Sequence, residues 1–119
     1  MEEEDWEIIK KAGAWVCLCP KSNEFIGVGK APSKKLFDAG IKLCLGTDSL
    51  ASNDSLYPLE ELMYFLDKNP WCSPALGLSF ISLNAGKALG LDNLGDIKEG
   101  FKGIFVCLSP KSKYYPLFE

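Results

Sequence analysis

Two short, mainly apolar segments in the first half of the chain alternate with amphipathic stretches. The segments are residues 14–19 and 41–45, and Lys42 is the one polar residue among them. Short, mainly apolar runs of strand length are typical of parallel strands that are covered on both faces. A polar loop and a helical pattern from Pro32 to a stop at Gly40 separate the two runs. The chain is therefore predicted to contain a βαβ unit and to belong to the α/β class.

Helical patterns flank this unit. Residues 2–12 begin with acidic side chains and end with basic ones, which suits a helix macrodipole, and Gly13 is expected to end that helix. After the second apolar run, Asp54 or Ser55 is predicted to cap a helix that continues to about residue 68.

Shorter elements are predicted in the last third of the chain. A helix is expected over residues 75–83 after a cap at Ser73, and Asn84 is expected to cap a further short one. Residues 95–103 are rich in turn-forming residues. They precede a third apolar run, residues 104–108, which we expect to form a strand.

The composition narrows the chemistry that the chain can perform. Its 119 residues carry a net charge of −3 and include no histidine. A general nucleic-acid binder shows clustered basic charge, and both Ser-His-Asp and Cys-His catalysis need an imidazole, so these classes are excluded for this chain. No apolar run is long enough to cross a bilayer, and residues 2–5 are all acidic. We therefore expect a cytoplasmic protein with neither a membrane nor a nucleic-acid partner.

The chain has five cysteines, an odd number without the density of a disulfide scaffold. Neither the Cys-x-x-Cys spacing of a redox pair nor the paired spacings of a zinc site occurs. Cys17 and Cys19 fall on the same side of the first apolar run, and Cys44 lies in the second. We expect reduced thiols that pack as small apolar groups, with a metal or redox role as the open alternative.

Polar residues follow each of the two predicted strands. Residues 20–23 follow the first and residues 46–49 follow the second. Because ligands gather at the carboxyl ends of parallel strands, these loops are expected to converge. Asp48 follows the mainly apolar run 41–45 after Gly46 and Thr47, where a partly desolvated carboxylate can act as a metal ligand or a general base. A helix cap or an Asx-turn is the alternative role for this side chain.

Several motifs resemble, in order and spacing, the last third of metal-dependent amidohydrolases. The resemblance is to the branch that contains cytosine, guanine and S-adenosylhomocysteine deaminases and chlorohydrolases, and it extends from residue 5 to about residue 108. A single Gly-Thr-Asp would be weak support, but several motifs in register are specific. The motifs are Leu-Cys-Pro-Lys-Ser-Asn at 18–23, Gly-Val-Gly-Lys-Ala-Pro at 27–32, Leu-Gly-Thr-Asp-Ser-Leu-Ala-Ser-Asn-Asp at 45–54, Asn-Ala-Gly-Lys-Ala-Leu-Gly-Leu at 84–91 and the turn at 95–103.

The resemblance implies that the chain is a fragment of a (β/α)8 TIM barrel, with residues 15–19 as the seventh strand and 41–45 as the eighth. Residues 1–92 would then belong to the barrel, and residues 93–119 would hold one strand of a small β-subdomain and a tail. A full barrel needs ~250 residues, and two strands cannot close one. We therefore expect the chain to self-associate or to pair with a partner.

The resemblance also implies a role for Asp48. In the family, the aspartate at this position coordinates a catalytic zinc or iron and takes a proton from the metal-bound water. Ser22, Asn23 and Ser49 are candidates for substrate contacts, with bracing of Asp48 as the alternative role. The family's histidine ligands and its usual catalytic glutamate would all precede Met1. The chain by itself is therefore expected to bind no metal and to be inactive, since a catalytic zinc normally has three protein ligands.

Two functions are predicted on this basis. In the first, the chain is the C-terminal segment of a metal-dependent hydrolase that acts on C–N or C–Cl bonds of ring amidines. Its small-molecule substrate would be a purine, pyrimidine or triazine, as in a deaminase or chlorohydrolase. In the second, the chain is a non-catalytic fragment or a fission subunit that self-associates or docks with a partner carrying the missing histidines.

Overall fold

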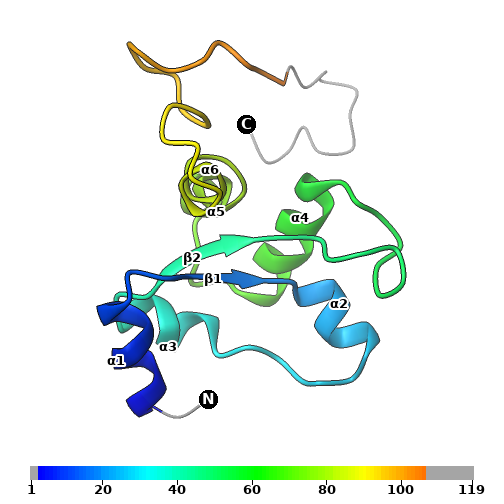
Figure 1. The fold of residues 1–119 in the computed structure, drawn as a ribbon. Helices are drawn as coiled ribbons and strands as arrows, with labels where there is room; N and C mark the ends of the chain where they lie inside the picture. The colour runs from blue at the N-terminus through cyan, green and yellow to red at the C-terminus, as the bar shows by residue number, and fades with distance from the viewer. Residues whose placement is uncertain (1–2, 107–119) are drawn as a thin grey trace.

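A two-stranded parallel sheet lies at the centre of the structure, a computed structural model that describes residues 3–106. Strand β1 (Trp15–Leu18) pairs with strand β2 (Lys42–Leu45) so that Cys17 lies opposite Cys44. The two arrows run side by side and point the same way in Figure 1. The predicted parallel βαβ unit is therefore confirmed, and the chain is of the α/β class.

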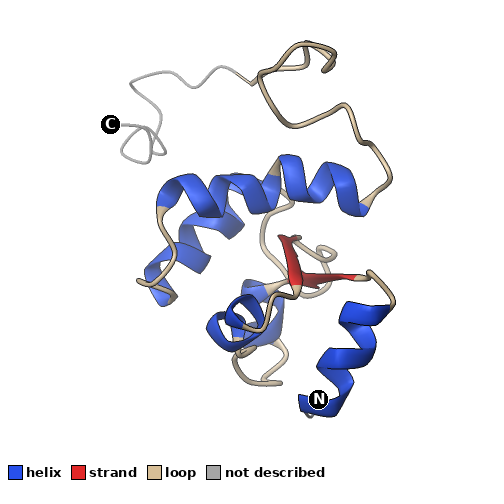
Figure 2. Cartoon of the chain, turned by 90° about the vertical axis from the view of Figure 1, so that its left-hand side faces the viewer, coloured by secondary structure: helices blue, strands red, loops and turns tan. Residues whose placement is uncertain are grey.

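Helices make up most of the remaining regular structure, and Figure 2 shows them in blue around the two red strands. Helices α5 and α6 run nearly end to end in Figure 2 and are seen end-on beside β2 in Figure 1. The helices are α1 (Glu3–Lys11), α2 (Pro20–Phe25), α3 (Ser33–Asp38), α4 (Pro58–Lys68), α5 (Pro74–Ile81) and α6 (Leu83–Ala88).

The ends of several helices lie where the sequence indicated. Gly13 follows α1 with a φ of 65°, a left-handed conformation that glycine adopts at no steric cost. Ser73 caps α5, because its Oγ accepts a hydrogen bond from the backbone N–H of Leu76 at 3.2 Å. Asn84 does not cap α6. It lies inside that helix, and its Nδ2 donates to the carbonyl oxygen of Leu43 at 2.8 Å, which ties α6 to the outer edge of β2.

Two predictions about the loops were wrong. Residues 20–25 form α2 rather than a loop, because Pro20 sits well in a first helical turn and the backbone N–H of Asn23 bonds back to the Cys19 carbonyl at 2.9 Å. Helix α4 begins only at Pro58, so neither Asp54 nor Ser55 caps it. Both predicted caps have other partners, Lys21 for the Asp54 carboxylate and the backbone N–H of Tyr57 for the Ser55 hydroxyl.

The hydrophobic core lies on one face of the sheet. Leu18, Leu43 and Leu45 are buried there in one cluster with side chains of α4 and α5, chiefly Leu62, Phe65 and Phe80. On the other face Cys17 and Lys42 are exposed. Cys44, on the same face, is buried. The prediction that these strands are covered on both faces is therefore wrong at Cys17 and Lys42, because no described element packs over their side chains.

The third predicted strand, over residues 104–108, does not form in residues 104–106, which are the part of it that the structure describes. Residues 104–106 form neither helix nor strand, and residues 107–108 lie outside the described residues. A strand needs a neighbour to complete its backbone hydrogen bonds, and within residues 3–106 the only sheet contains β1 and β2. Ile104 and Val106 are 68% and 79% exposed as a result. The same described part of the chain holds no helix of the length and apolarity needed to span a membrane.

Candidate functional site

Asp48 lies three residues beyond the end of β2, at the carboxyl edge of the sheet. Its backbone adopts a φ of 59°, and it is the one non-glycine residue of the described chain with a positive φ. The side chain is exposed, and its Oδ2 accepts hydrogen bonds from the hydroxyls of Ser52 at 2.7 Å and Ser22 at 2.8 Å. Two hydroxyls from different segments therefore hold one oxygen of this carboxylate in place.

These hydroxyls also stabilise the charge of the site. The hydrogen bond from Ser52, and then the one from Ser22, lower the pKa of the Asp48 carboxyl below its ordinary value, because both stabilise the ionised form. An aspartate is an anion at neutral pH even with its ordinary pKa, and the two hydroxyls extend this ionised range to lower pH. The alternative of a helix cap does not apply, since α4 begins ten residues later and its N-cap position is Tyr57.

A buried network supports the loop that follows β2. The Glu61 carboxylate of α4 is 1% exposed and accepts hydrogen bonds from the backbone N–H of Lys21 at 2.8 Å and from Nδ2 of Asn53 at 2.9 Å. The same Nδ2 also donates to the carbonyl oxygen of Thr47 at 2.7 Å. The network links the start of α2, the loop and α4, so the backbone next to Asp48 is fixed from two sides.

The structure brings together only some of the predicted site residues. Ser22 is 2% exposed and contacts Asp48 directly, as the bracing role requires. Ser49 is exposed, and its Oγ accepts from the backbone N–H of Ala51 at 3.3 Å within the same turn. Asn23 lines a cavity that Asp48 does not line.

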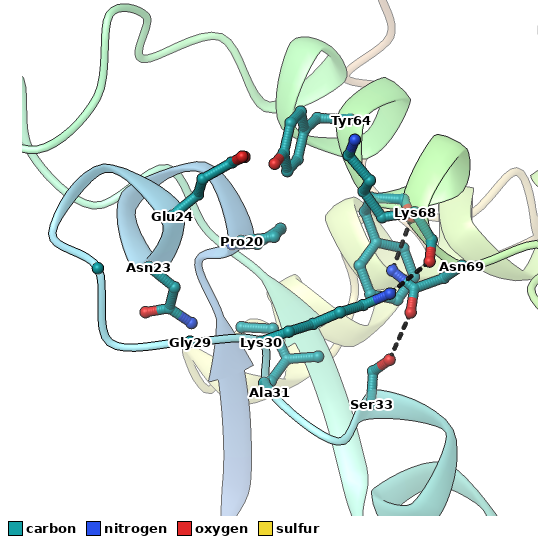
Figure 3. Close-up of a pocket in the computed structure, with 13 residues that line it drawn as sticks. Pro20, Asn23, Glu24, Gly29, Lys30, Ala31, Ser33, Tyr64, Lys68 and Asn69 are labelled. Atoms are coloured by element: carbon teal, nitrogen blue, oxygen red, sulfur yellow. Dashed lines mark hydrogen bonds between the residues drawn. The ribbon is translucent and has the colours of Figure 1, made fainter.

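That cavity has a volume of about 470 Å³ and lies between α2, the segment leading to α3, and α4 (Figure 3). The polar groups that line it include Asn23, Glu24, Lys30 and Tyr64. Figure 3 shows the Glu24 and Tyr64 side chains pointing toward one another, while the Lys30 amine reaches α4 and donates to the Lys68 carbonyl oxygen at 2.6 Å. Asp48 does not line this cavity, so the two features are distinct.

The residues present do not make a metal centre by themselves. The chain has no histidine, and no group of three or more His, Cys, Asp or Glu side chains within residues 3–106 is placed to hold a metal ion. Asp48 is a suitable oxygen ligand, but residues 3–106 place no complete set of such side chains around it. Catalytic zinc normally has three protein ligands, so the set is incomplete.

Sequence reasoning gave Ser22 a bracing role as one of two alternatives, but it did not single out the other groups that hold Asp48. Ser52 and Asn53 lie in the segment that resembles the amidohydrolases, but their spacing alone does not show which backbone or side-chain atoms they meet. For Glu61, by contrast, the sequence does indicate a buried, paired carboxylate. This residue lies four residues before the buried Phe65 on the apolar face of α4, where an unpaired charge is costly and a partner is expected.

The chain is similar to known proteins along its whole length. A family model described as "Amidohydrolase family" matches residues 1–118. The 5-methylthioadenosine/S-adenosylhomocysteine deaminase of Dictyoglomus thermophilum is 35% identical, over 98% of this chain and 29% of that protein. The enzyme of the same name from Pyrococcus furiosus is 39% identical, over 85% of this chain and 26% of that protein.

Solved structures of deaminases and chlorohydrolases are also similar to this chain. An adenosine deaminase from Xanthomonas campestris with bound zinc superposes with a TM-score of 0.85 at 27% identity, covering 100% of this chain and 29% of that one. The atrazine chlorohydrolase of Arthrobacter aurescens TC1, in complex with zinc, superposes with a TM-score of 0.75 at 26% identity, covering 85% and 24%. The chain thus spans less than a third of the length of these relatives.

Proposed function

Because the chain belongs to the amidohydrolase family, we propose that it is the C-terminal segment of a hydrolase that displaces an amino group or a chloride from a ring amidine. The substrate class is a purine, pyrimidine or triazine, in keeping with the names of its deaminase and chlorohydrolase relatives. The observation that carries the proposal is the Asp48 carboxylate, which stands ionised at the carboxyl end of β2 between two hydroxyl donors.

Asp48 serves in this proposal as a metal ligand and as the group that accepts a proton from the attacking water. An aspartate suits both tasks when it is ionised and fixed, because a fixed ligand loses little freedom when it binds. The zinc or iron of such enzymes lowers the pKa of water so that hydroxide is available near neutral pH. The other metal ligands are expected from sequence that this chain does not contain.

The remaining candidate residues have different roles in the proposal. Ser22 and Ser52 position Asp48 and lower its pKa, so they act through that residue rather than on the substrate. Asn23 and Ser49 remain candidates for substrate contacts. In a complete enzyme that contains this segment, Asn23→Ala is expected to change kcat/KM if Asn23 touches substrate. A loss of stability with unchanged kcat/KM would assign it to bracing instead.

A chimera tests the proposal. This chain replaces the matching C-terminal segment of the Dictyoglomus thermophilum deaminase, and the product is assayed for zinc content and for ammonia release from 5-methylthioadenosine. We expect Asp48→Asn to reduce the rate of ammonia release by about 10²- to 10⁴-fold, the usual contribution of a general acid–base group. Asp67→Asn, an exposed substitution on α4, is the matched control and is expected to have no effect.

Two results would overturn the assignment. One is an Asp48→Asn chimera with full zinc content and full activity. The other is a chimera that has the circular dichroism spectrum of the intact deaminase but neither holds zinc nor releases ammonia.

A second function is favoured by the exposed apolar surface. Ile97, Ile104 and Val106 are 84%, 68% and 79% exposed, and both strands of the sheet are edge strands. Such surface is typical of a segment that packs against another chain. The chain would then be a non-catalytic fragment or fission subunit that self-associates or docks with a partner. Sedimentation velocity is expected to show association, and a compact monomer that binds no hydrophobic dye would contradict this function.

A further inference from the structure

Two thiols face each other on the open face of the sheet. Cys17 of β1 and Cys44 of β2 are directly opposite in the register of the parallel pair, so both side chains point to the same side. The direction of the Cys17 thiol is clear from Gly46, because a Cβ built on that glycine would lie 2.8 Å from the Cys17 Sγ. The sulfur of Cys17 therefore leans across toward the β2 side of the sheet.

The spacing suits a covalent bond between the two sulfurs. Neighbouring strands lie about 4.7–4.9 Å apart, which falls within the Cα separation of about 4.4–6.8 Å that disulfides span. Cys19 is the competing partner for Cys17, because a Cβ built on Gly46 would also lie 3.6 Å from the Cys19 Sγ, but its backbone position is less suited to the bond. Residues two apart on a strand are separated by about 6.6 Å, near the upper limit, and Cys19 already lies beyond the end of β1.

We propose that Cys17 and Cys44 are a redox modification site, which a hydroperoxide converts into an intrachain disulfide between β1 and β2. Both cysteines are free thiols in the structure. Cys17 is exposed and Cys44 is buried, so a small oxidant reaches the pair through the Cys17 thiol. The disulfide would join the two strands whose following segments carry Ser22 and Asp48.

The reaction balances with hydrogen peroxide as the oxidant. One thiolate attacks a peroxide oxygen, the O–O bond breaks, and a sulfenic acid and one water are formed. The second thiol then attacks the sulfenic sulfur, so that the S–S bond forms, the S–O bond breaks and a second water leaves. Two thiols lose two protons and two electrons in total, and one peroxide is reduced to two waters.

The two thiols of the pair interact with each other. Hydrogen bonding from the Cys17 thiol lowers the pKa of Cys44, while the same interaction, followed by burial, raises the pKa of Cys17. Cys44 is therefore the thiol of the pair that ionises more readily, and the exposed Cys17 is the thiol that a dissolved oxidant reaches.

Peptide mapping of the full chain tests the proposal. The purified chain is treated with hydrogen peroxide at low protein concentration, remaining thiols are alkylated, and the product is digested with trypsin without reduction. Cleavage after lysine places Cys17 and Cys19 in the peptide of residues 12–21 and Cys44 in the peptide of residues 43–68. We expect these two peptides to appear linked, with a mass lower by two hydrogen atoms than their sum.

Single substitutions identify which sulfur is used. Cys17→Ser and Cys44→Ser are each expected to abolish the linked peptide, whereas Cys19→Ser and Cys72→Ser are expected to retain it. Oxidation of the unsubstituted chain in concentrated urea is a further control, because it does not depend on the folding of any variant. In the unfolded chain, the Cys17–Cys44 disulfide is expected to form no more often than the other possible disulfides. A linked peptide that persists in Cys17→Ser, or oxidised chain without any 12–21 to 43–68 link, would overturn the proposal.

Discussion

Glu61 offers the sharpest test of how the site is held, because its buried carboxylate joins three segments. It accepts hydrogen bonds from the backbone N–H of Lys21 and from Asn53, and Asn53 in turn donates to the Thr47 carbonyl next to Asp48. Substituting Glu61→Ala removes both acceptor oxygens and leaves the α2 terminus and the Asn53 amide without this partner. The prediction is a large loss of stability together with a looser loop around Asp48.

The magnitude follows from the two hydrogen bonds. Each bond to a charged group contributes about 1.5–3 kcal/mol, which gives about 3–6 kcal/mol for both. Removing a buried charge offsets part of this loss, since the carboxylate no longer has to be desolvated. We therefore expect Glu61→Ala to lower the free energy of unfolding by about 3 kcal/mol. Glu61→Gln keeps one acceptor and is expected to cost about half as much.

Urea denaturation followed by circular dichroism measures the loss, and hydrogen exchange of the Lys21 amide reports on the site itself. The matched control is Asp67→Ala, an exposed carboxylate on the same helix, which is expected to change stability by less than about 0.5 kcal/mol. The hydrogen-exchange rate of the Lys21 amide should rise in Glu61→Ala and stay unchanged in Asp67→Ala. A Glu61→Ala chain as stable as the parent, with a protected Lys21 amide, would refute the reasoning.

Three further predictions follow from individual contacts. Carbon NMR is expected to find the pKa of Asp48 below that of an ordinary aspartate, and Ser52→Ala should raise that pKa. Because the pKa is lower in the folded state than in the unfolded state, the ionised Asp48 carboxylate stabilises the fold near neutral pH. This stabilisation is lost as the pH falls below about 4. Gly46→Ala should cost about 1 kcal/mol in urea denaturation, since its Cβ would press on the Cys17 sulfur, and should cost less in a Cys17→Ala background; equal costs in both would contradict the contact. Asn84→Ala should cost about 1–2 kcal/mol by the same measurement, because it leaves the Leu43 carbonyl unpaired, while a neutral effect would show that water replaces the amide.

The two strands and several helix ends of the fold were predictable from local sequence patterns. The two mainly apolar runs became β1 and β2, as expected for runs of strand length that are bounded by glycine or proline. The parallel pairing followed from the helical segment between them. Gly13 and Ser73 ended and began helices as expected, since these residues act through their own backbone or through atoms three residues away.

The failures share a physical cause, which is competition from distant partners. Asp54 was expected to cap α4, but its carboxylate pairs with the Lys21 amine from α2, 33 residues earlier. Asn84 was expected to cap α6, but its amide bonds the edge of β2, 41 residues earlier. Residues 104–106 have the composition of a strand and still form none, because a strand depends on a neighbour that no local pattern supplies.

The geometry around Asp48 bears on the choice between the two proposed functions. Its backbone adopts a φ of 59°, a conformation that is unfavourable for residues other than glycine, although aspartate tolerates it better than most. Such strain persists where the surroundings over-determine it, and it is common at functional sites. The groups that hold Asp48 directly or through its loop are Ser22, Ser52, Asn53 and Glu61, all of them buried and all within this chain. A segment that served only to dock would gain nothing from fixing an ionised carboxylate at its exposed edge, so this arrangement favours a segment that contributes Asp48 to a larger catalytic site.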